Sequence, residues 1–191
     1  NAKSSIDNKG EGNEIVIKDG KIESIKPIST LKGTMITINN LFYNLPARRK
    51  FLKNDTTEFR KITSIIRRFL ISNPEIGFKY INKEKIIYNL NPESLIDRLD
   101  SIYGKSIKES LLKVEYKRNQ YNIKGYISNL SLIKKRPTEQ YLYINNRFVQ
   151  DRLIKSSINK SYLNLLDRGE FSVYFLNIEM PLDLIDFNVH P

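Results

Sequence analysis

The sequence predicts an α+β protein, because strand hairpins and amphipathic helices follow one another along the chain in separate runs. Asp19 and Gly20 separate two strand-like segments, residues 14–18 and 21–26, and both turn residues tolerate positive φ. Apolar residues recur instead at helical spacing over residues 59–70 and 95–103. Of the 191 residues 40% are hydrophobic, enough to build a core in one large domain or two small ones.

The first elements are an arm, the hairpin, a strand and a short helix. Residues 1–13 are polar and contain two glycines, so we expect a flexible arm. A strand is predicted over residues 33–39, after the hairpin. Asn44 is expected to cap the short helix and Pro46 to begin it, because proline suits the first helical turn.

Two longer helices flank a second hairpin. Asp55 is the expected cap of the first helix, and Asn73 and Pro74 end it. The hairpin spans residues 76–90, and Gly104 ends the helix that follows it. The side chains expected to face the core are Phe59, Ile62, Ile66, Phe69 and Leu70 in the first helix, and Leu95, Ile96, Leu99, Ile102 and Tyr103 in the second.

The second half reads as four strands, a basic loop and one helix. Strands are predicted over residues 111–116, 121–128, 140–144 and 171–180, with the loop at residues 129–138. The helix is expected to begin after a cap at Asp151 and to turn Ile154, Ile158, Tyr162 and Leu165 inward.

Positive charge is concentrated in the middle of the chain. The net charge is +11, and residues 105–160 hold 13 basic and 4 acidic side chains, a balance of +9. Such a field favours a polyanionic partner, most simply nucleic acid, although a solvated lysine-rich surface has the same composition. The chain has no cysteine, which excludes disulfides and thiolate metal sites. It also has no apolar run of the ~18–20 residues that span a membrane, so no membrane association is expected.

Three runs carry a family resemblance. They are residues 42–51, with Pro46 followed by Ala47, Arg48 and Arg49; residues 141–154, with Asn145, Asn146 and Arg147; and residues 186–191, which end in His190 and Pro191. In this order and spacing they resemble the N-terminal half of MutL-type DNA mismatch repair proteins. The resemblance covers residues 14–191 and predicts that the chain is a piece of a longer protein.

The resemblance implies a partial GHKL ATPase α/β sandwich followed by a ribosomal-protein-like transducer domain. Residues 14–92 would form the C-terminal part of the ATPase domain, and residues 93–104 a connecting helix. Residues 105–191 would form the transducer domain, truncated at its C-terminal end.

The resemblance also assigns roles to single residues. Gly33 and Thr34 match its last ATP-site motif, in which the threonine hydroxyl helps to position adenine through a water. Lys53 matches a basic residue near the end of the short helix that faces a DNA-binding groove in the family. Arg147 and Arg152, beside the turn of the second run and the helix after it, are candidates for contact with the DNA backbone. The basic loop adds three candidates for phosphate contact, which are Lys134, Lys135 and Arg136.

Each of these DNA contacts has a structural alternative. The cations near residues 48–53 can be the solvated face of a helix, and Arg147 and Arg152 can form salt bridges, for example with Asp151. Asn146 stands where the family usually has glycine, and asparagine can still adopt the left-handed geometry of a hairpin turn. His190 is expected to be structural, because no nucleophile or orienting partner lies near it in the sequence.

The chain lacks the sequence motifs of known nucleotide-hydrolysis and metal-dependent nuclease sites. It contains no Asp-x-Gly-x-Gly motif, no Walker-type phosphate loop and no acidic cluster, so we assign no catalytic and no metal-binding residue. The parent protein would use ATP and Mg, whereas this chain alone is predicted to be inactive. The family lysine that meets the terminal phosphate would follow Pro191, where the chain stops.

The implied function is that of an ATP-gated, dimerising clamp in the cytoplasm. It would bind DNA without sequence preference and couple mismatch recognition to strand removal. Its partners would be DNA, a MutS-type mismatch recognition protein and a second copy of itself. Two alternatives stay open: a gyrase- or topoisomerase-type GHKL subunit, and a nucleic-acid-binding module without an ATPase role.

Overall fold

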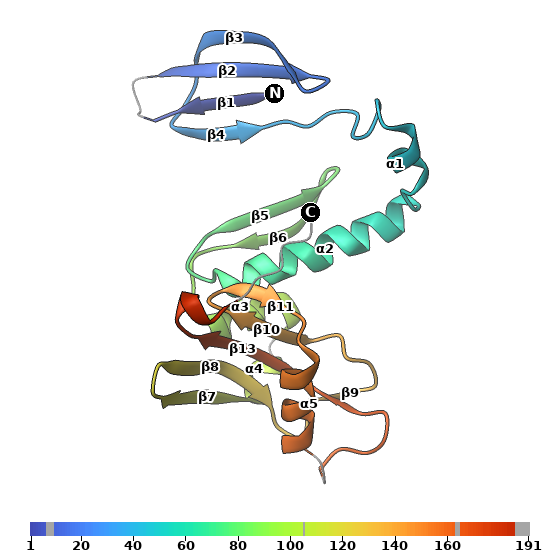
Figure 1. The fold of residues 1–191 in the computed structure, drawn as a ribbon, viewed down its shortest axis with the longest axis vertical. Coiled ribbons are helices and arrows are strands. Elements are labelled where there is room, and N and C mark those ends of the chain that lie inside the picture. Colours follow the sequence, from blue (N-terminus) through green and yellow to red (C-terminus); the bar gives the residue numbers. More distant parts are fainter. Residues whose placement is uncertain (7–9, 105, 163–164, 186–191) are drawn as a thin grey trace. The chain divides into compact units, whose positions relative to one another are not determined.

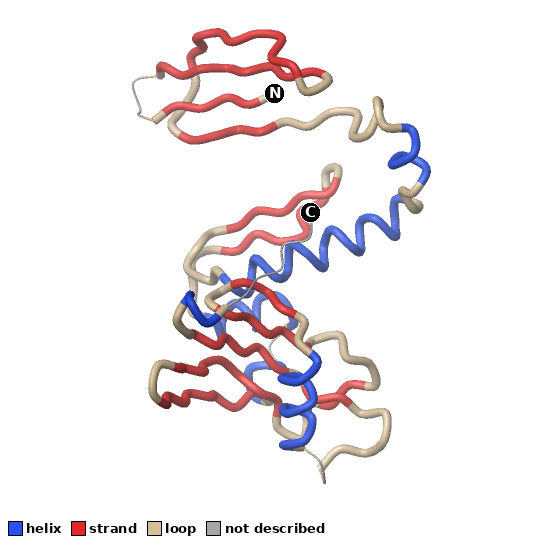
Figure 2. The backbone as a smooth tube through the Cα atoms, viewed as in Figure 1, coloured by secondary structure: helices blue, strands red, loops and turns tan. Residues whose placement is uncertain are grey.

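The computed structural model describes residues 1–6, 10–104, 106–162 and 165–185. The chain forms two compact units, residues 1–59 and 60–191, and the division falls inside helix α2 (Asp55–Ser72). Figures 1 and 2 show the elements of each unit. No helix among the described residues is long and apolar enough to cross a membrane.

The first unit is built on a four-stranded antiparallel sheet in the order β3-β2-β1-β4. Asp19 (φ 51°) and Gly20 (φ 76°) form the turn between β2 and β3, which confirms the predicted hairpin. The predicted strand over residues 33–39 is present but shorter. The strands are β1 (Ala2–Ser5), β2 (Glu11–Lys18), β3 (Lys21–Ser29) and β4 (Gly33–Ile36).

The prediction of a flexible arm over residues 1–13 is wrong for those of its residues that the structure describes. Ala2–Ser5 form a strand between β2 and β4, and Glu11 already belongs to β2. The strand is polar, so its sequence carries no alternation that would reveal it. Backbone pairing with two segments distant in sequence holds it in place.

Two helix caps differ from the prediction. The short helix α1 (Pro46–Lys50) begins at Pro46 as expected, but Asn44 does not cap it. Its amide donates instead to Asp19 Oδ1 at 2.9 Å. At α2 the cap is Asn54 and not Asp55, because Asn54 Oδ1 accepts the backbone N–H of Thr57 at 2.9 Å.

The buried side of α2 in the second unit is rotated from the predicted stripe. Leu70 and Ile71 are buried, whereas Ile62 and Phe69 are 49% and 58% exposed. Polar groups take part in the buried side, because Arg67 Nε donates to the Tyr88 hydroxyl at 2.8 Å. A sequence rule that counts only apolar residues misses a face on which arginine stems and aromatic rings share the packing.

A second hairpin and helix α3 complete this part of the unit. The hairpin consists of β5 (Phe78–Asn82) and β6 (Lys85–Leu90), as predicted. Helix α3 (Leu95–Tyr103) begins after Ser94, whose hydroxyl accepts the backbone N–H of Asp97, and Gly104 ends it. The predicted apolar stripe of α3 faces the core.

The second unit centres on a five-stranded sheet in the order β11-β10-β13-β8-β7. Strands β10 and β13 are parallel, and the other neighbours are antiparallel. A separate two-stranded pair joins β9 to β12, so the strand expected over residues 171–180 is interrupted. The strands are β7 (Leu111–Arg118), β8 (Tyr121–Ser128), β9 (Ile133–Lys134), β10 (Gln140–Ile144), β11 (Arg147–Val149), β12 (Phe171–Ser172) and β13 (Tyr174–Glu179).

Helices cover both faces of this sheet (Figure 1). Ile71 of α2, Leu99 of α3 and Ile107 of the short helix α4 (Ser106–Glu109) pack on one face with Phe175. Helix α5 (Arg152–Ser161) packs Ile154 and Ile158 on the other face, against Leu142, Tyr174 and Leu176. The mixed α and β architecture agrees with the predicted fold class.

The structure near the C-terminal end agrees only in part with the predictions. Tyr162 is buried as predicted, but Leu165 is 56% exposed, because α5 ends at Ser161. A 3-10 turn over Leu182–Leu184 follows β13. His190 and the third family run, residues 186–191, lie outside the described residues.

The predicted domain boundary does not coincide with the division between the two units. Residues 60–104 belong to the same compact unit as the five-stranded sheet, whereas the predicted ATPase segment ends at residue 92 and the predicted connecting helix spans residues 93–104. The reason is packing, since Ile71 and Leu99 share one core with Tyr143 and Phe175. The names given to the domains remain predictions.

Candidate nucleic-acid interface

Gly33 and Thr34 lie in the first unit, at the start of β4. Thr34 pairs in register with Ser4, and their hydroxyl oxygens are 2.9 Å apart. Gly33 has φ 131°, a conformation that side-chain-bearing residues rarely adopt, so this position favours glycine. Both residues are exposed, and the Ser4–Thr34 hydroxyl pair is therefore accessible to water.

Lys53 lies between α1 and α2 in the same unit. Its backbone N–H donates to Glu58 Oε1 at 3.0 Å, which fixes the entry of α2. Its side chain is exposed, as are Arg48, Arg49 and Lys50 in the last turn of α1. Four cations within six residues are therefore exposed to solvent. This exposure is consistent both with phosphate contacts and with a solvated helix face.

Arg147 begins β11, after a two-residue turn in the second unit. Asn145 (φ 47°) and Asn146 (φ 64°) are both left-handed, as the sequence required of this turn. The exposed Arg147 pairs in register with Ile144 of β10. The turn therefore places the arginine at the edge of the five-stranded sheet.

Side-chain amides of β13 and of the turn bind one another and hold the turn. The Asn177 amide accepts the backbone N–H of Asn146 at 3.1 Å and donates to its side-chain oxygen at 2.8 Å. Asn145 forms a reciprocal pair with the backbone of Met180, at 2.8 and 3.0 Å. These bonds offset the conformational cost of a left-handed backbone at Asn146, which glycine would adopt at lower cost.

Asp151 is a helix cap, as predicted. Its Oδ1 accepts the backbone N–H of Ile154 at 2.8 Å, and no ion pair of Asp151 is found among the described residues. The salt bridge considered as an alternative role for Arg147 and Arg152 is therefore not formed with Asp151. The cap places exposed Arg152 and partly exposed Lys155 on the first turn of α5.

A cleft of about 450 Å³ lies beside this first turn. Arg152 and Lys155 line one part of it, and Pro137, the residue after Arg136, lines another. Leu142, Val149 and Tyr174 contribute an apolar floor. Asp151 also lines the cleft, but its carboxylate caps α5, and the two cations outnumber it. A net positive lining over a partly apolar floor suits a phosphodiester whose sugar contacts carbon atoms.

Gln140 adds a polar group to the cleft. Its Nε2 donates to Ser172 O at 3.1 Å, and its buried Oε1 has no hydrogen-bond partner among the described residues. A buried oxygen without a donor is unfavourable unless a water or a ligand supplies one. Neither Gln140 nor Lys155 was predicted from the sequence, although Lys155 is three residues after Arg152 and therefore on the same side of a helix.

The basic loop contributes unequally. Lys134 is part of β9 and pairs in register with Phe171, so its backbone position is fixed. Lys135 Nζ lies 2.7 Å from Glu170 Oε1, and this contact holds the pKa of Glu170 below its usual value. Arg136 is exposed, and its guanidinium has no hydrogen-bond or ion-pair partner within the described part of the chain. Of the three, Arg136 is the cation most available to a ligand.

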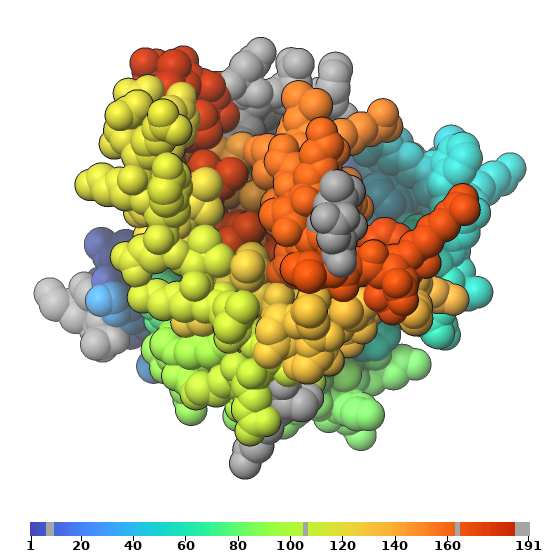
Figure 3. Space-filling view, turned by 90° about the horizontal axis from the view of Figure 1, so that it is seen from below, coloured from blue at the N-terminus to red at the C-terminus, as the bar shows by residue number. Residues whose placement is uncertain are grey.

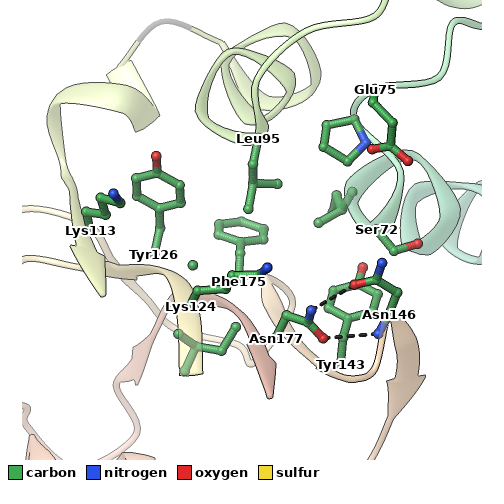
Figure 4. Close-up of a pocket in the computed structure, with 14 residues that line it drawn as sticks. Ser72, Glu75, Leu95, Lys113, Lys124, Tyr126, Tyr143, Asn146, Phe175 and Asn177 are labelled. Carbon is green, nitrogen blue, oxygen red and sulfur yellow. Dashed lines mark hydrogen bonds between the residues drawn. The ribbon is translucent and has the colours of Figure 1, made fainter. Parts of the chain in front are cut away.

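A second hollow, of about 340 Å³, lies on the opposite face of the sheet (Figure 4). Leu95 and Phe175 give it apolar walls, and Lys113 and Lys124 lie at its edge. Both lysines are ion-paired with carboxylates, Glu115 and Glu179. Within the described residues no group of three histidine, cysteine, aspartate or glutamate side chains is placed to hold a metal.

Comparison with protein families gives a match over the second unit. Residues 99–191 fit the family described as DNA mismatch repair protein, C-terminal domain. The chain is 34% identical over 190 residues to the DNA mismatch repair protein MutL of Leptospira biflexa, an alignment that covers 97% of this chain and 31% of the relative. It is 39% identical over 160 residues to the MutL of Chlorobium phaeovibrioides, covering 84% and 26%.

Solved structures agree with these relatives. A crystal structure of the N-terminal domain of a DNA repair protein superposes with a TM-score of 0.82 at 26% identity and covers all of this chain and 63% of that one. The Aquifex aeolicus MutL ATPase domain complexed with ADP gives a TM-score of 0.74 at 25% identity, covering 94% and 66%. The chain thus spans less than a third of the two MutL relatives and about two thirds of these solved domains.

Proposed function

Because this chain belongs to the MutL family of DNA mismatch repair proteins, we propose that it provides a DNA-binding surface of such a protein, centred on the cleft beside α5. The observation that carries the proposal is the convergence of two cationic segments. Arg152 and Lys155 line the cleft from α5, and Pro137 brings the end of the basic loop to the same cleft.

The chemistry of the cleft is suited to the DNA backbone. Arginine offers a planar set of N–H donors that matches two oxygens of one phosphate, and lysine adds a point charge. Phosphates repeat identically along every sequence, so these contacts fix the position of the strand without reading bases. We therefore expect weak, salt-sensitive binding without sequence preference, in which Lys134, Arg136 and Arg147 contribute further phosphate contacts. Lys53, in the first unit, is proposed as a separate phosphate contact.

The proposal extends to ATP in the full-length protein. The relative from Aquifex aeolicus was solved with ADP, and its ATPase domain superposes on this chain. The accessible Ser4–Thr34 hydroxyl pair fits a water-mediated contact to a nucleotide base. ATP would supply the switch between open and closed clamp, and Gly33 and Thr34 would help to hold its base.

The remaining parts of the clamp hypothesis rest on family membership. We propose that two copies of the full-length protein close around DNA when ATP binds. The closed dimer would pass the signal of a MutS-type mismatch recognition protein on to strand removal. We also propose that most of the groups that hold ATP and Mg in the full-length protein lie outside this chain.

A charge-reversal experiment tests the cleft. Fluorescence anisotropy would measure the affinity of the chain for two duplexes of unrelated sequence over a range of salt concentrations. If about five phosphates are neutralised, log affinity should fall against log salt with a slope near −4 to −5. Arg152→Glu and Lys155→Glu should each weaken binding to both duplexes by about tenfold, because an attraction becomes a repulsion.

Lys160→Glu is the matched control for this experiment. Lys160 is exposed in the last turn of the same helix and does not line the cleft, so the change of net charge is the same. We expect its effect to stay within about threefold. Equal losses for all three variants would show that only the overall charge matters, and the cleft would lose its assigned role.

A further inference from the structure

The β7–β8 hairpin carries a group of side chains that the cleft does not explain. Tyr116 and Tyr121 are 55% and 39% exposed, although tyrosine rings are usually buried in large part. Arg118 lies between them in sequence and forms no ion pair among the described residues. Exposed aromatic rings interleaved with unpaired cations are the composition of a single-strand binding surface.

Strand register places the two rings together. Arg118 is directly opposite Tyr121, and Tyr116 is opposite Ile123. Cross-strand partners share a face of the sheet, and so do residues two apart in a strand. Tyr116, Arg118 and Tyr121 therefore lie on one face, with the two rings as diagonal neighbours whose backbones are about 7 Å apart.

This face is the one that carries α5 and the cleft. Ile123 and Ile178 pack with the α5 side of the core, and the row continues through Ile144 to Arg147. Tyr116 and Arg147 thus stand at opposite ends of one row across all five strands, about 19 Å apart at the usual strand spacing. Figure 3, seen from below, shows both the β7–β8 segment, in yellow, and α5, in orange, at the surface of this unit.

The turn makes the hairpin tip a defined surface. Only Asn119 and Gln120 separate Arg118 from Tyr121, and Asn119 has φ 51°, as a tight hairpin turn requires. The two strands are paired over their full described length, from Leu111 with Ser128 to this tip. The rings are therefore held on a rigid element, which lowers the entropy that binding would cost.

We propose that the β7–β8 tip binds unpaired nucleobases by stacking on Tyr116 and Tyr121, with Arg118 on the adjoining phosphate. The inference rests on the proposed DNA binding and adds a second contact site to it. The ligand is a single strand, because the faces of duplex bases are covered by their own neighbours. Its backbone would run from this tip across the sheet toward the cations at the α5 end.

The test compares the affinity of this chain for single-stranded DNA with its affinity for duplex DNA. The probes are a fluorescent oligothymidine of about 12 nucleotides and a blunt duplex of the same length. Tyr116→Ala and Tyr121→Ala should each weaken oligothymidine binding by at least about fivefold, because base–aromatic stacking is lost. Neither should change duplex affinity by more than about twofold.

Phenylalanine variants and a leucine variant are the controls. Tyr116→Phe and Tyr121→Phe keep the ring and should bind like the unchanged protein. Leu112→Ala removes another exposed apolar side chain from the same face of β7, farther from the tip, and should have no effect. Thermal unfolding of each variant, measured in parallel, should be unchanged because these side chains lie largely outside the core.

The outcomes separate this inference from the proposed function. Unchanged oligothymidine binding by both alanine variants would overturn the stacking site, as would equal loss of duplex binding. A loss in the phenylalanine variants equal to that in the alanine variants would assign the effect to the hydroxyl groups and also overturn it. If the chain without substitutions binds duplex but not oligothymidine, only this inference is refuted. If it binds neither DNA, the proposed function is refuted.

Discussion

Replacing Arg98 with methionine should destabilise the second unit by about 3–5 kcal/mol. Arg98 is fully buried in α3, with 0% of its surface exposed. Its Nε lies 2.6 Å from Glu93 Oε1. Its other donors bond four backbone carbonyls that end α2, shape the following loop and precede α3, those of Leu70, Pro74, Ile76 and Asn91.

The expected loss of stability depends on which of these oxygen acceptors stay without a donor once the guanidinium is removed. The bond to Leu70 O is fully buried, and leaving that carbonyl unpaired costs about 1–3 kcal/mol. The other bonds are partly buried, so water can replace Arg98 at some of their acceptors. Glu93 is 21% exposed and loses its cation, which adds to the loss. The total is a large share of the ~5–15 kcal/mol that a domain has.

Urea unfolding followed by circular dichroism measures this loss, and amide hydrogen exchange in α3 locates it. Arg98→Lys keeps the charge but has fewer and differently placed donors, so the stability of this variant should lie between those of Arg98→Met and the unsubstituted chain. Arg118→Met, at an exposed position without an ion pair, should stay within about 0.5 kcal/mol of the unchanged chain. A loss below about 1 kcal/mol for Arg98→Met would refute the view that this side chain joins α2 to α3.

Two further predictions concern a glycine and a carboxylate of the same sheet. Gly125→Ala should destabilise by at least about 2 kcal/mol more than Gly33→Ala in urea unfolding, because a Cβ at Gly125 would lie 2.0 Å from the Phe175 carbonyl oxygen and one at Gly33 meets nothing. Equal losses would mean that backbone strain alone sets the effect. Hydrogen bonding from Lys124 lowers the pKa of Glu179, so its stabilising contribution is present above the unfolded-state pKa of 4.5 and is lost as the pH falls through the lower folded value. Glu179→Gln should therefore flatten the acid side of the pH–stability curve, and an unchanged curve would contradict the assignment.

The sequence by itself was sufficient for features that depend on neighbouring residues. The turns at Asp19–Gly20 and Asn145–Asn146, the cap at Asp151 and the end of α3 at Gly104 lie where they were predicted. Each depends on the backbone preference or side-chain reach of one or two residues, which a sequence displays directly. The family was also identified from sequence, because its runs are contiguous and their order is preserved.

Part of the candidate site was predictable in the same way. Arg152 was named from its run, and Lys155 follows it at helical spacing, so a helical reading of that segment would have added it. The cleft itself was not predictable. It exists because the chain between β10 and β13 returns to place α5 beside the loop that ends at Pro137.

Only the tertiary structure decided which distant segments share a surface. Ala2–Ser5 join a sheet through backbone bonds to strands that begin at Glu11 and Gly33, and the sequence of this mostly polar segment does not predict the pairing. Arg98 is buried because carbonyls from Leu70 to Asn91 surround it, which its place in α3 does not reveal. Side-chain burial and strand pairing depend on contacts across many intervening residues, whereas local propensity extends over only a few.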